Sequence, residues 1–291
     1  MKLIRLVTAT AMVGALANTP AAAQQAVPLV LNHLVVVLDS ATWSDVRASP
    51  FLNGQFGASV PVFFRPDTSV GAVNLYGRYN YLVLAGPNSR HHRQTGDIAI
   101  VLASDAAGAI TTLTARGPSR RTLVDSAAIP FDGLGFPFEQ LRPSGADSMS
   151  AHAVLSMVQY TTQAAATVAA VDSLPLTNLA TSRFLARYFD SRKLFSYLTG
   201  ATLAMPVDDI AKIVRVLQRD GVTVLVEGEG AIIKLDGCTL HLIPSFVGAG
   251  VKQLQFALTH TAAGNPLYRF GPKSQLRFGP GPIAVWDFNL R

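Results

Sequence analysis

The chain has 291 residues, of which 49% are hydrophobic and 14% are charged, so it can bury a large core and is not of the disordered class. Its formal net charge of +6 comes from scattered basic residues rather than from a basic stripe, which argues against nucleic acid as a partner. The single cysteine, Cys238, excludes an intramolecular disulfide and a zinc site built on paired cysteines.

The first 23 residues have the three regions of a cleavable export signal. Lys2 and Arg5 give a basic start, residues 6–17 are apolar, and Ala21-Ala22-Ala23 precede two glutamines. Because the apolar run is shorter than the roughly 20 residues that span a bilayer, we expect no stable membrane insertion after cleavage. We predict a cut after Ala23 and a periplasmic or secreted mature protein.

The next part of the chain has strand and helix signals in a regular order. The apolar run 31–38 predicts a buried strand, and Asp39 is placed to cap a short helix over 41–48. Three strand-like runs follow, at 60–64, 74–76 and 79–85. The order strand, helix, strand, strand, strand is a βαβββ unit.

The middle of the chain has weaker patterns. Residues 97–103 and 151–161 read as strands, and 118–150 as loop or weak strand. The aromatic-rich stretch 183–197 predicts a helix. A second unit is therefore expected here in degraded form.

The same βαβββ order recurs from residue 200. Residues 200–205 predict a short strand, after which Pro206 occupies the first position of a helix with one apolar stripe. Gly221 is placed to end that helix. The strand-like runs that follow lie at 222–226, 231–235, 238–243, 251–258, 274–278 and 283–288.

Repeated units of this kind predict an α+β fold of paired βαβββ modules, with mixed or antiparallel sheets curved around a cleft. We expect an N-terminal module pair over residues 24–180, with its second module degraded, and a C-terminal βαβββ module over 181–291. Small molecules usually bind in such a cleft, so we expect a small-molecule ligand.

Several short motifs resemble the glyoxalase-like members of the vicinal oxygen chelate superfamily. They are Asn32-His33 in the first strand, Tyr76-Gly77, and the YLVL run of Tyr81 to Leu84. An uncharacterised bacterial branch of that group shares three further segments, at 49–52, 270–274 and 284–288. The resemblance implies paired βαβββ modules that hold a divalent metal between histidine and glutamate side chains, with His33 as the first-strand ligand.

Two positions at which the resemblance expects carboxylates carry other residues. Val83 occupies the position in the fourth strand, and Gln159 the position before Tyr160. An alkyl side chain cannot bind a metal, and a neutral amide binds divalent ions weakly. A divalent metal is therefore an alternative rather than an assigned cofactor, with His33 as its one candidate ligand.

Five residues are our candidates for ligand binding, drawn from the resemblance and from strand alternation. Arg78 and Tyr81 lie where an aromatic or anionic ligand would meet them, and His241 points away from Leu240 and Leu242. The full set is His33, Arg78, Tyr81, Gln159 and His241. No pattern identifies a catalytic residue.

The leading hypothesis is an exported glyoxalase-like protein that binds a small molecule in a sheet-lined cleft without the usual metal carboxylates. Two alternatives stay open. One is a metal-dependent lyase, isomerase or dioxygenase that uses His33, and the other is an envelope module that binds a partner protein through its sheet edges. Homodimerisation is a further expectation, because paired-module proteins often associate through their sheets.

Overall fold

The computed structural model describes residues 27–63, 70–87, 94–124, 138–160, 185–264 and 266–288. The expected export signal and the expected module boundary at 180–181 lie outside these residues. None of the described helices is long and apolar enough to cross a membrane.

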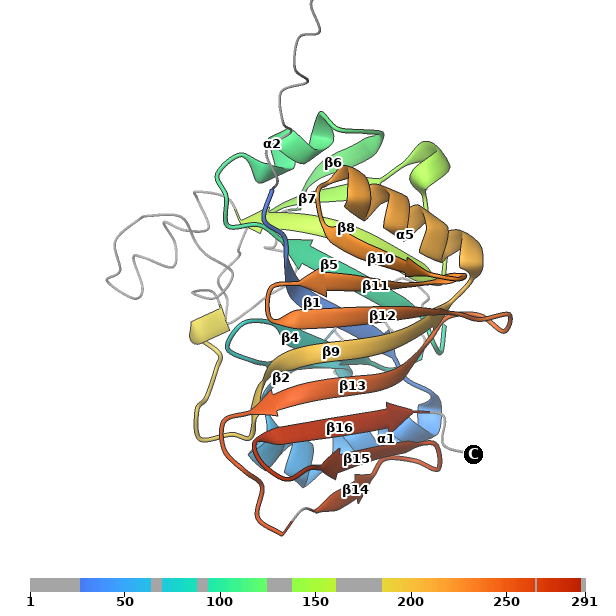
Figure 1. Cartoon of the computed structure of the whole chain (residues 1–291). Helices are drawn as coiled ribbons and strands as arrows, with labels where there is room; N and C mark the ends of the chain where they lie inside the picture. The colour runs from blue at the N-terminus through green and yellow to red at the C-terminus, as the bar shows by residue number, and fades with distance from the viewer. Residues whose placement is uncertain are drawn as a thin grey trace, which may run out of the picture.

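The described strands form two open eight-stranded sheets that lie against each other (Figure 1). The first sheet has the order β2-β3-β4-β1-β5-β8-β7-β6, and the second has the order β10-β11-β12-β9-β13-β16-β15-β14. Both sheets mix parallel and antiparallel pairs and carry few helices. This arrangement confirms the predicted α+β fold and is consistent with paired βαβββ modules.

Each sheet is built from two successive units. The first unit comprises β1 (Val30–Val37), α1 (Ser40–Ala48), the π-helical turn η1 (Leu52–Phe56), β2 (Ala58–Phe63), β3 (Val70–Tyr76) and β4 (Tyr81–Ala85). The second comprises β5 (Ile98–Ala103), α2 (Ala109–Thr114), β6 (Ser119–Val124), β7 (Phe138–Pro143), η3 (Gly145–Asp147) and β8 (Ala153–Tyr160). The third comprises β9 (Phe195–Met205), α5 (Val207–Arg219), β10 (Thr223–Glu227), β11 (Gly230–Leu235) and β12 (Cys238–Pro244). The fourth comprises β13 (Gly250–Leu258), β14 (Leu267–Arg269), β15 (Ser274–Phe278) and β16 (Ile283–Phe288).

The fourth unit differs from the others in the direction of its last strand. In the first three units a helix carries the chain back, so the first and fourth strands run parallel: β1 with β4, β5 with β8, and β9 with β12. The described residues between β13 and β14 form no helix, and β13 pairs with β16 antiparallel. Without a return helix, β14 runs antiparallel to β13. Relative to the first strand of the unit, β14, β15 and β16 therefore each run in the direction opposite to that of the corresponding strand in the other three units.

One segment differs from the expectations drawn from the sequence. The predicted helix at 183–197 is wrong, because within its described part only residues 185–186 are helical and β9 begins at Phe195. Phe195 is fully buried and its ring contacts those of Phe56 and Phe256, so packing overrides local helix preference. In the stretch 118–150, predicted as loop or weak strand, the described residues include the paired strands β6 and β7.

Two helices begin and end as the sequence predicts. The Asp39 carboxylate accepts hydrogen bonds from the backbone N–H groups of Ala41 and Thr42, which caps α1. Burial acts to raise the pKa of Asp39, but the hydrogen bonds from Thr42 and Ala41 outweigh it and the pKa is lowered. Helix α5 begins after Pro206, and Gly221 follows it at φ +87°, a conformation that favours glycine.

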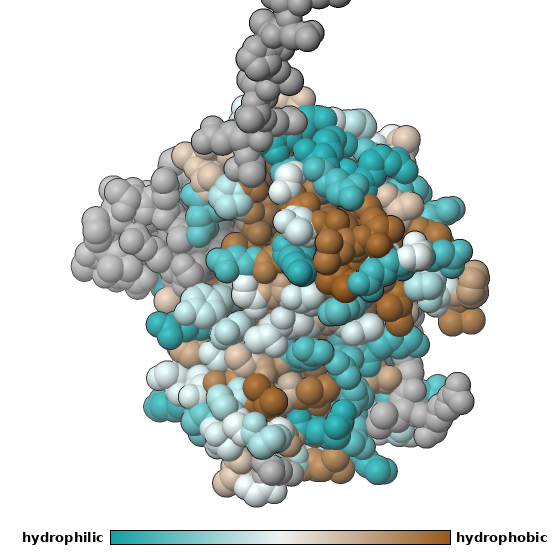
Figure 2. All heavy atoms as spheres, in the orientation of Figure 1, coloured by the Kyte–Doolittle hydropathy of each residue, from teal (hydrophilic) through white to brown (hydrophobic). Residues whose placement is uncertain are grey.

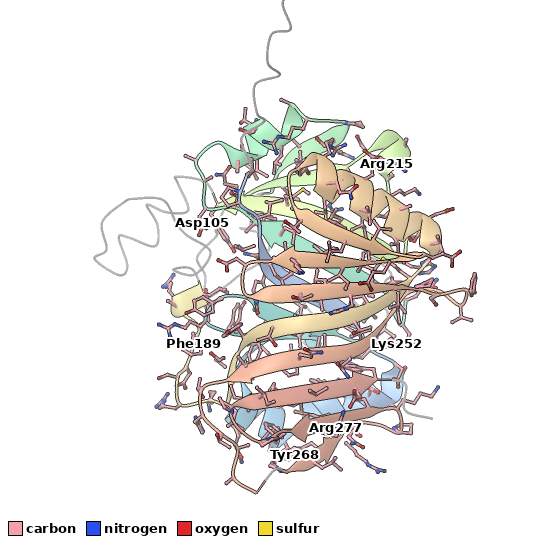
Figure 3. The ribbon with its side chains drawn as sticks, in the orientation of Figure 1. Asp105, Phe189, Arg215, Lys252, Tyr268 and Arg277 are labelled. Atoms are coloured by element: carbon pink, nitrogen blue, oxygen red, sulfur yellow. The ribbon has the colours of Figure 1, made fainter. Side chains whose placement is uncertain are left out.

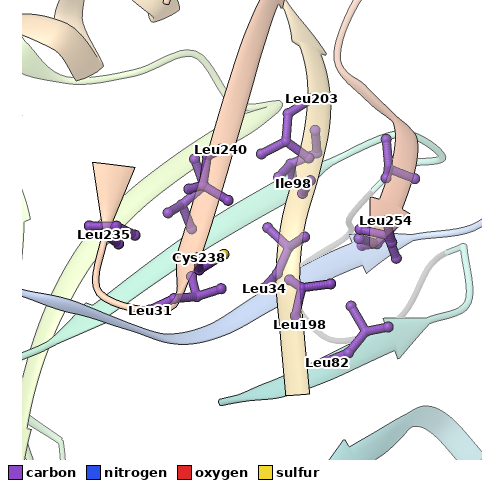
Figure 4. Packing of buried hydrophobic residues seen from close by; sticks show 14 of the residues in the cluster. Leu31, Leu34, Leu82, Ile98, Leu198, Leu203, Leu235, Cys238, Leu240 and Leu254 are labelled. Carbon is purple, nitrogen blue, oxygen red and sulfur yellow. The ribbon is translucent and has the colours of Figure 1, made fainter. Parts of the chain in front are cut away.

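One apolar core lies between the two sheets and joins the halves of the chain. Leu31, Leu34, Leu82 and Ile98 of the first sheet meet Leu198, Leu203, Leu240 and Leu254 of the second (Figure 4). All eight side chains are at most 1% exposed. Cys238 belongs to the same core, and burial raises the pKa of its thiol to about 12.

A tight turn between β3 and β4 fixes how the sheets meet. The Asn80 side chain donates to the carbonyl of Leu198 (3.0 Å) and accepts from the Leu198 N–H (2.8 Å). At Gly77 a Cβ atom would lie 2.5 Å from the carbonyl oxygen of Ser196, so only glycine fits there. The turn therefore contacts β9 through its backbone, and side chains at Gly77 would force the sheets apart.

Polar contacts also join α5 to the second unit. Asp147, which is buried, accepts hydrogen bonds from Arg215 (2.9 Å) and Arg219 (2.8 Å) on successive turns of α5. The buried Asp209 carboxylate accepts from the N–H (2.8 Å) and the hydroxyl (2.6 Å) of Ser150. These contacts hold a helix of one half against a loop of the other.

Replacement of Asp147 tests this coupling. Asp147→Ala leaves Arg215 and the largely buried Arg219 without their shared carboxylate, and we expect the free energy of unfolding to fall by about 2–3 kcal/mol. Urea denaturation of the purified protein measures this. Arg192→Ala is the matched control, because that arginine is 87% exposed and its ion pair contributes little. Equal stability of the Asp147→Ala protein and the wild type would contradict the coupling.

Candidate functional site

The outer face of the first sheet carries a group of polar and aromatic side chains. His33 on β1 is paired with Tyr81 on β4, and Tyr81 is paired with Tyr76 on β3. Strand alternation places these three on the face opposite Leu34 and Leu82, which point into the core. The same face of β8 carries Tyr160.

Four rings form a continuous stack on this face. The His33 and Tyr81 rings lie 4.4 Å apart with an interplanar angle of 26°. Tyr81 stacks on Tyr76 at 5.0 Å, and Tyr76 stacks on Tyr188 at 4.6 Å. Tyr188 comes from the segment before β9, so a residue outside the sheet completes the stack. Stacked planar groups of this kind bind other planar groups well.

Amide groups lie beside the rings. The His33 Nδ1 atom is 2.7 Å from the Asn32 Oδ1 atom, which fixes the orientation of the imidazole. The Asn74 side chain donates to the Tyr76 hydroxyl (3.0 Å). Asn74 is only 4% exposed, and its Oδ1 atom has no hydrogen-bond partner among the described residues. A buried acceptor without a partner costs free energy unless a bound molecule supplies a donor.

Two tyrosines of the group are held in the protonated form. Burial raises the pKa of Tyr81 well above its usual value, and the neighbouring Tyr160 and Tyr76 raise it further. Burial also raises the pKa of Tyr160, although a side-chain hydrogen bond with Asn32 acts in the opposite direction. Asp105, labelled in Figure 3 in the loop after β5, adds to the increase. At neutral pH both hydroxyls are protonated, as in an ordinary tyrosine, and each can donate or accept a hydrogen bond.

The residues around His33 do not fit a divalent metal. Val83 lies on β4 between Val35 of β1 and Asn74 of β3, so the position expected to carry a carboxylate is surrounded by alkyl and amide groups. Among the described residues, no three His, Cys, Asp or Glu side chains are grouped so that they could hold a metal ion. A metal bound at His33 would need ligands other than the usual carboxylates.

Arg78 and Gln159 lie away from the ring stack. Arg78 is exposed on the turn after β3, where its guanidinium lies 5.5 Å from the centre of the Tyr79 ring. Gln159 accepts from the Ile110 N–H of α2 (3.3 Å) and donates to the Ala106 carbonyl (2.5 Å). Gln159 thus points to the helix side of β8, whereas Tyr160 points to the stack. The structure brings His33 and Tyr81 together and separates both from Arg78 and Gln159.

His241 lies on the other sheet. It is exposed on β12 and lines a cavity of about 240 Å³ with Ile232, Ile243 and the acidic residues Glu227 and Glu229. The outer face of this sheet is otherwise polar near β9 and β13, with Thr202, Gln253 and Gln255. His241 and His33 therefore cannot bind the same small molecule.

A second cavity of about 240 Å³ lies where the two sheets meet, beside the start of α1. Its lining includes Thr42, Lys252 and Lys273, and Figure 3 labels Lys252 near the start of β13. It has no aromatic stack, and the Asp39 carboxylate that borders it is engaged in capping α1.

Sequence reasoning missed three members of the group around His33. Tyr188 was hidden inside the stretch predicted to be a helix. Asn74 and Tyr160 alternate with core residues along β3 and β8, and that alternation was the signal available in the sequence.

No family model matches the chain, and no curated protein matches it. Three solved structures with similar courses of the chain are a hypothetical protein from Staphylococcus aureus, a xylose isomerase-like TIM barrel/4-hydroxyphenylpyruvate dioxygenase fusion protein, and a mutant of 4-hydroxymandelate synthase from Streptomyces coelicolor. Their TM-scores are 0.46, 0.41 and 0.41, at identities of 12%, 14% and 13%. The similarities cover 75%, 79% and 78% of this chain and 87%, 36% and 69% of those chains. At these values they indicate nothing about the chemistry of the site.

Alkaline titration tests the burial of the tyrosines. The pKa values of Tyr81 and Tyr160 are higher in the folded protein than the pKa of about 10 of an unfolded tyrosine. Their contribution to the free energy of unfolding is therefore complete below about pH 10 and is lost as the pH rises above it. Of the seven tyrosines, at least two should stay protonated in the native protein until it unfolds. Absorbance at 295 nm measures this, and Tyr81→Phe and Tyr160→Phe should each remove one delayed group. Simultaneous ionisation of all seven in the native protein, as in urea, would contradict the assignment.

Proposed function

We propose that this chain is an exported, glyoxalase-like protein that binds a small aromatic molecule on the outer face of its first sheet, without the usual metal carboxylates. The observation that carries the proposal is the stack of His33, Tyr81, Tyr76 and Tyr188 beside the buried carbonyl oxygen of Asn74, which has no hydrogen-bond partner among the residues that the structure describes. The group lies below the surface, with Tyr76 0% and Tyr81 9% exposed. It combines planar apolar contact with a few fixed polar groups, which is how small-molecule sites achieve both affinity and orientation.

The chemistry of the group defines the ligand class. The ring faces favour a planar ligand, and the Asn74 Oδ1 atom accepts a hydrogen bond from a hydroxyl or amine on it. The protonated Tyr81 hydroxyl can donate to a carbonyl, carboxylate or phenolic oxygen. A hydroxylated aromatic compound meets both requirements. Export is proposed from the N-terminal sequence, so the ligand is one met outside the cytoplasm.

A binding experiment tests this function on the mature protein that starts at Gln24. The probes are catechol and 4-hydroxybenzoate, with cyclohexanecarboxylate as the non-aromatic control, and saturation-transfer NMR followed by calorimetry gives the dissociation constants. We expect the aromatic probes to bind and the control not to bind. His33→Ala and Tyr81→Leu should each weaken binding about fivefold, because each removes one stacking partner worth about 1 kcal/mol.

His260→Ala is the matched control, since this histidine is exposed and lies on the other sheet near the end of β13. Its binding should equal that of the wild type. Tyr81→Phe keeps the ring and removes the hydroxyl, so a loss with this variant isolates the hydrogen bond. Binding of neither aromatic probe, or binding that His33→Ala and Tyr81→Leu leave unchanged, would refute the proposed site.

A further inference from the structure

Each open sheet ends in two edge strands, and three of the four described edges are protected against pairing with another chain. Unpaired backbone groups at an edge invite a further strand, and proline, charged residues or shortness prevent this. Strand β2 contains Pro61, β6 carries Arg120 and Arg121, and β14 has only three residues and ends with Arg269. These edges are unsuited to association.

The fourth edge, β10, lacks this protection. Its sequence is Thr-Val-Leu-Val-Glu, with no proline and with its one charge at the end. Leu225 is 43% exposed and Val226 is 58% exposed, although both are large hydrophobic residues. They project to opposite faces of the strand, so β10 is uncovered on both faces.

A hydrophobic patch continues from β10 onto its surroundings. Val224 on β10 and Val214 on α5 are only partly buried at the margin of the core. Figure 2 shows hydrophobic side chains gathered over the region where α5 meets β10 and β11. A contiguous apolar patch at a sheet edge marks an interaction surface rather than a solvated edge.

The sequence of β10 is self-complementary in antiparallel pairing. When two copies pair about a two-fold axis through Leu225, each Leu225 faces its own equivalent and each Val224 faces a Val226. Thr223 then faces Glu227, so no like charges oppose each other and apolar side chains meet on both faces. A second copy of this chain therefore satisfies the edge without any further group.

We propose that the protein forms a two-fold homodimer in which β10 pairs with β10 of a second copy, so that the two second sheets become one continuous sheet. The pairing satisfies the free backbone groups of both edges and covers Leu225 and Val226. The ring stack lies on the first sheet of each copy, so dimerisation leaves the proposed ligand face of both copies separate from the interface.

Sedimentation velocity of the mature protein at micromolar concentrations, supported by light scattering, tests the dimer. Wild type should sediment as a dimer. Leu225→Lys places two like charges face to face at the two-fold axis and should weaken the dimer at least tenfold. Leu267→Lys is the matched control, because Leu267 is 51% exposed on the protected edge β14 and should leave the dimer unchanged.

A pair of variants at Thr223 tests the register of the β10–β10 pairing. These variants also test the dimer if the Leu225→Lys protein does not fold. Thr223→Lys faces Glu227 of the second copy and should strengthen the dimer, whereas Thr223→Glu faces the same carboxylate and should weaken it. Opposite responses support the pairing. A monomeric wild type, a dimer that Leu225→Lys leaves intact, equal responses of the two Thr223 variants, or occupation of β10 by a different protein would overturn the proposal.

Discussion

The need to bury two apolar sheet faces against each other determines the rest of this structure. Neither eight-stranded sheet can cover its own inner face, and Leu34, Leu82, Leu203 and Leu254 achieve complete burial only because the sheets share one core. The Asn80 turn and the Asp147–Arg219 contact then fix the two sheets relative to each other.

The two outer faces have different characters. The first sheet carries stacked rings with amide groups among them, while the second sheet carries Thr202, Gln253, Gln255 and the exposed His241. The outer face of the first sheet thus carries the ordered aromatic contacts on which the proposed ligand site rests. The second sheet provides an exposed apolar edge instead. The two halves share a fold but differ in the groups that they present to other molecules: a ring stack in the first and an apolar strand edge in the second.

Local signals predicted much of the fold. The Asp39 cap, the apolar stripe of α5 and Gly221 depend on neighbours in sequence, and the structure has them where the sequence indicates. Non-local packing was beyond such signals. Phe195 begins a strand because its ring packs between Phe56 and Phe256, and the loss of the return helix before β14 reverses strands that look ordinary in sequence.

The candidate site was predicted in part for the same reason. His33 and Tyr81 were both candidates from the motifs of the first unit, and the structure pairs them on the adjacent strands β1 and β4. Tyr188 reaches the stack from a distant segment, and no periodicity reveals that contact. Gln159 was predicted from its position before Tyr160, but the alternation of β8 turns it toward α2, where it binds the backbone of Ala106 and Ile110.

Elemental analysis tests the central claim, that the His33 face binds an aromatic ligand through rings and amides and not through a metal. Mature protein is purified natively from the periplasm without chelators, alongside His33→Ala, and metals are quantified by mass spectrometry. The account predicts far less than one divalent metal per chain in both proteins. Stoichiometric metal in the wild type that is lost in His33→Ala would contradict it and would make His33 a metal ligand.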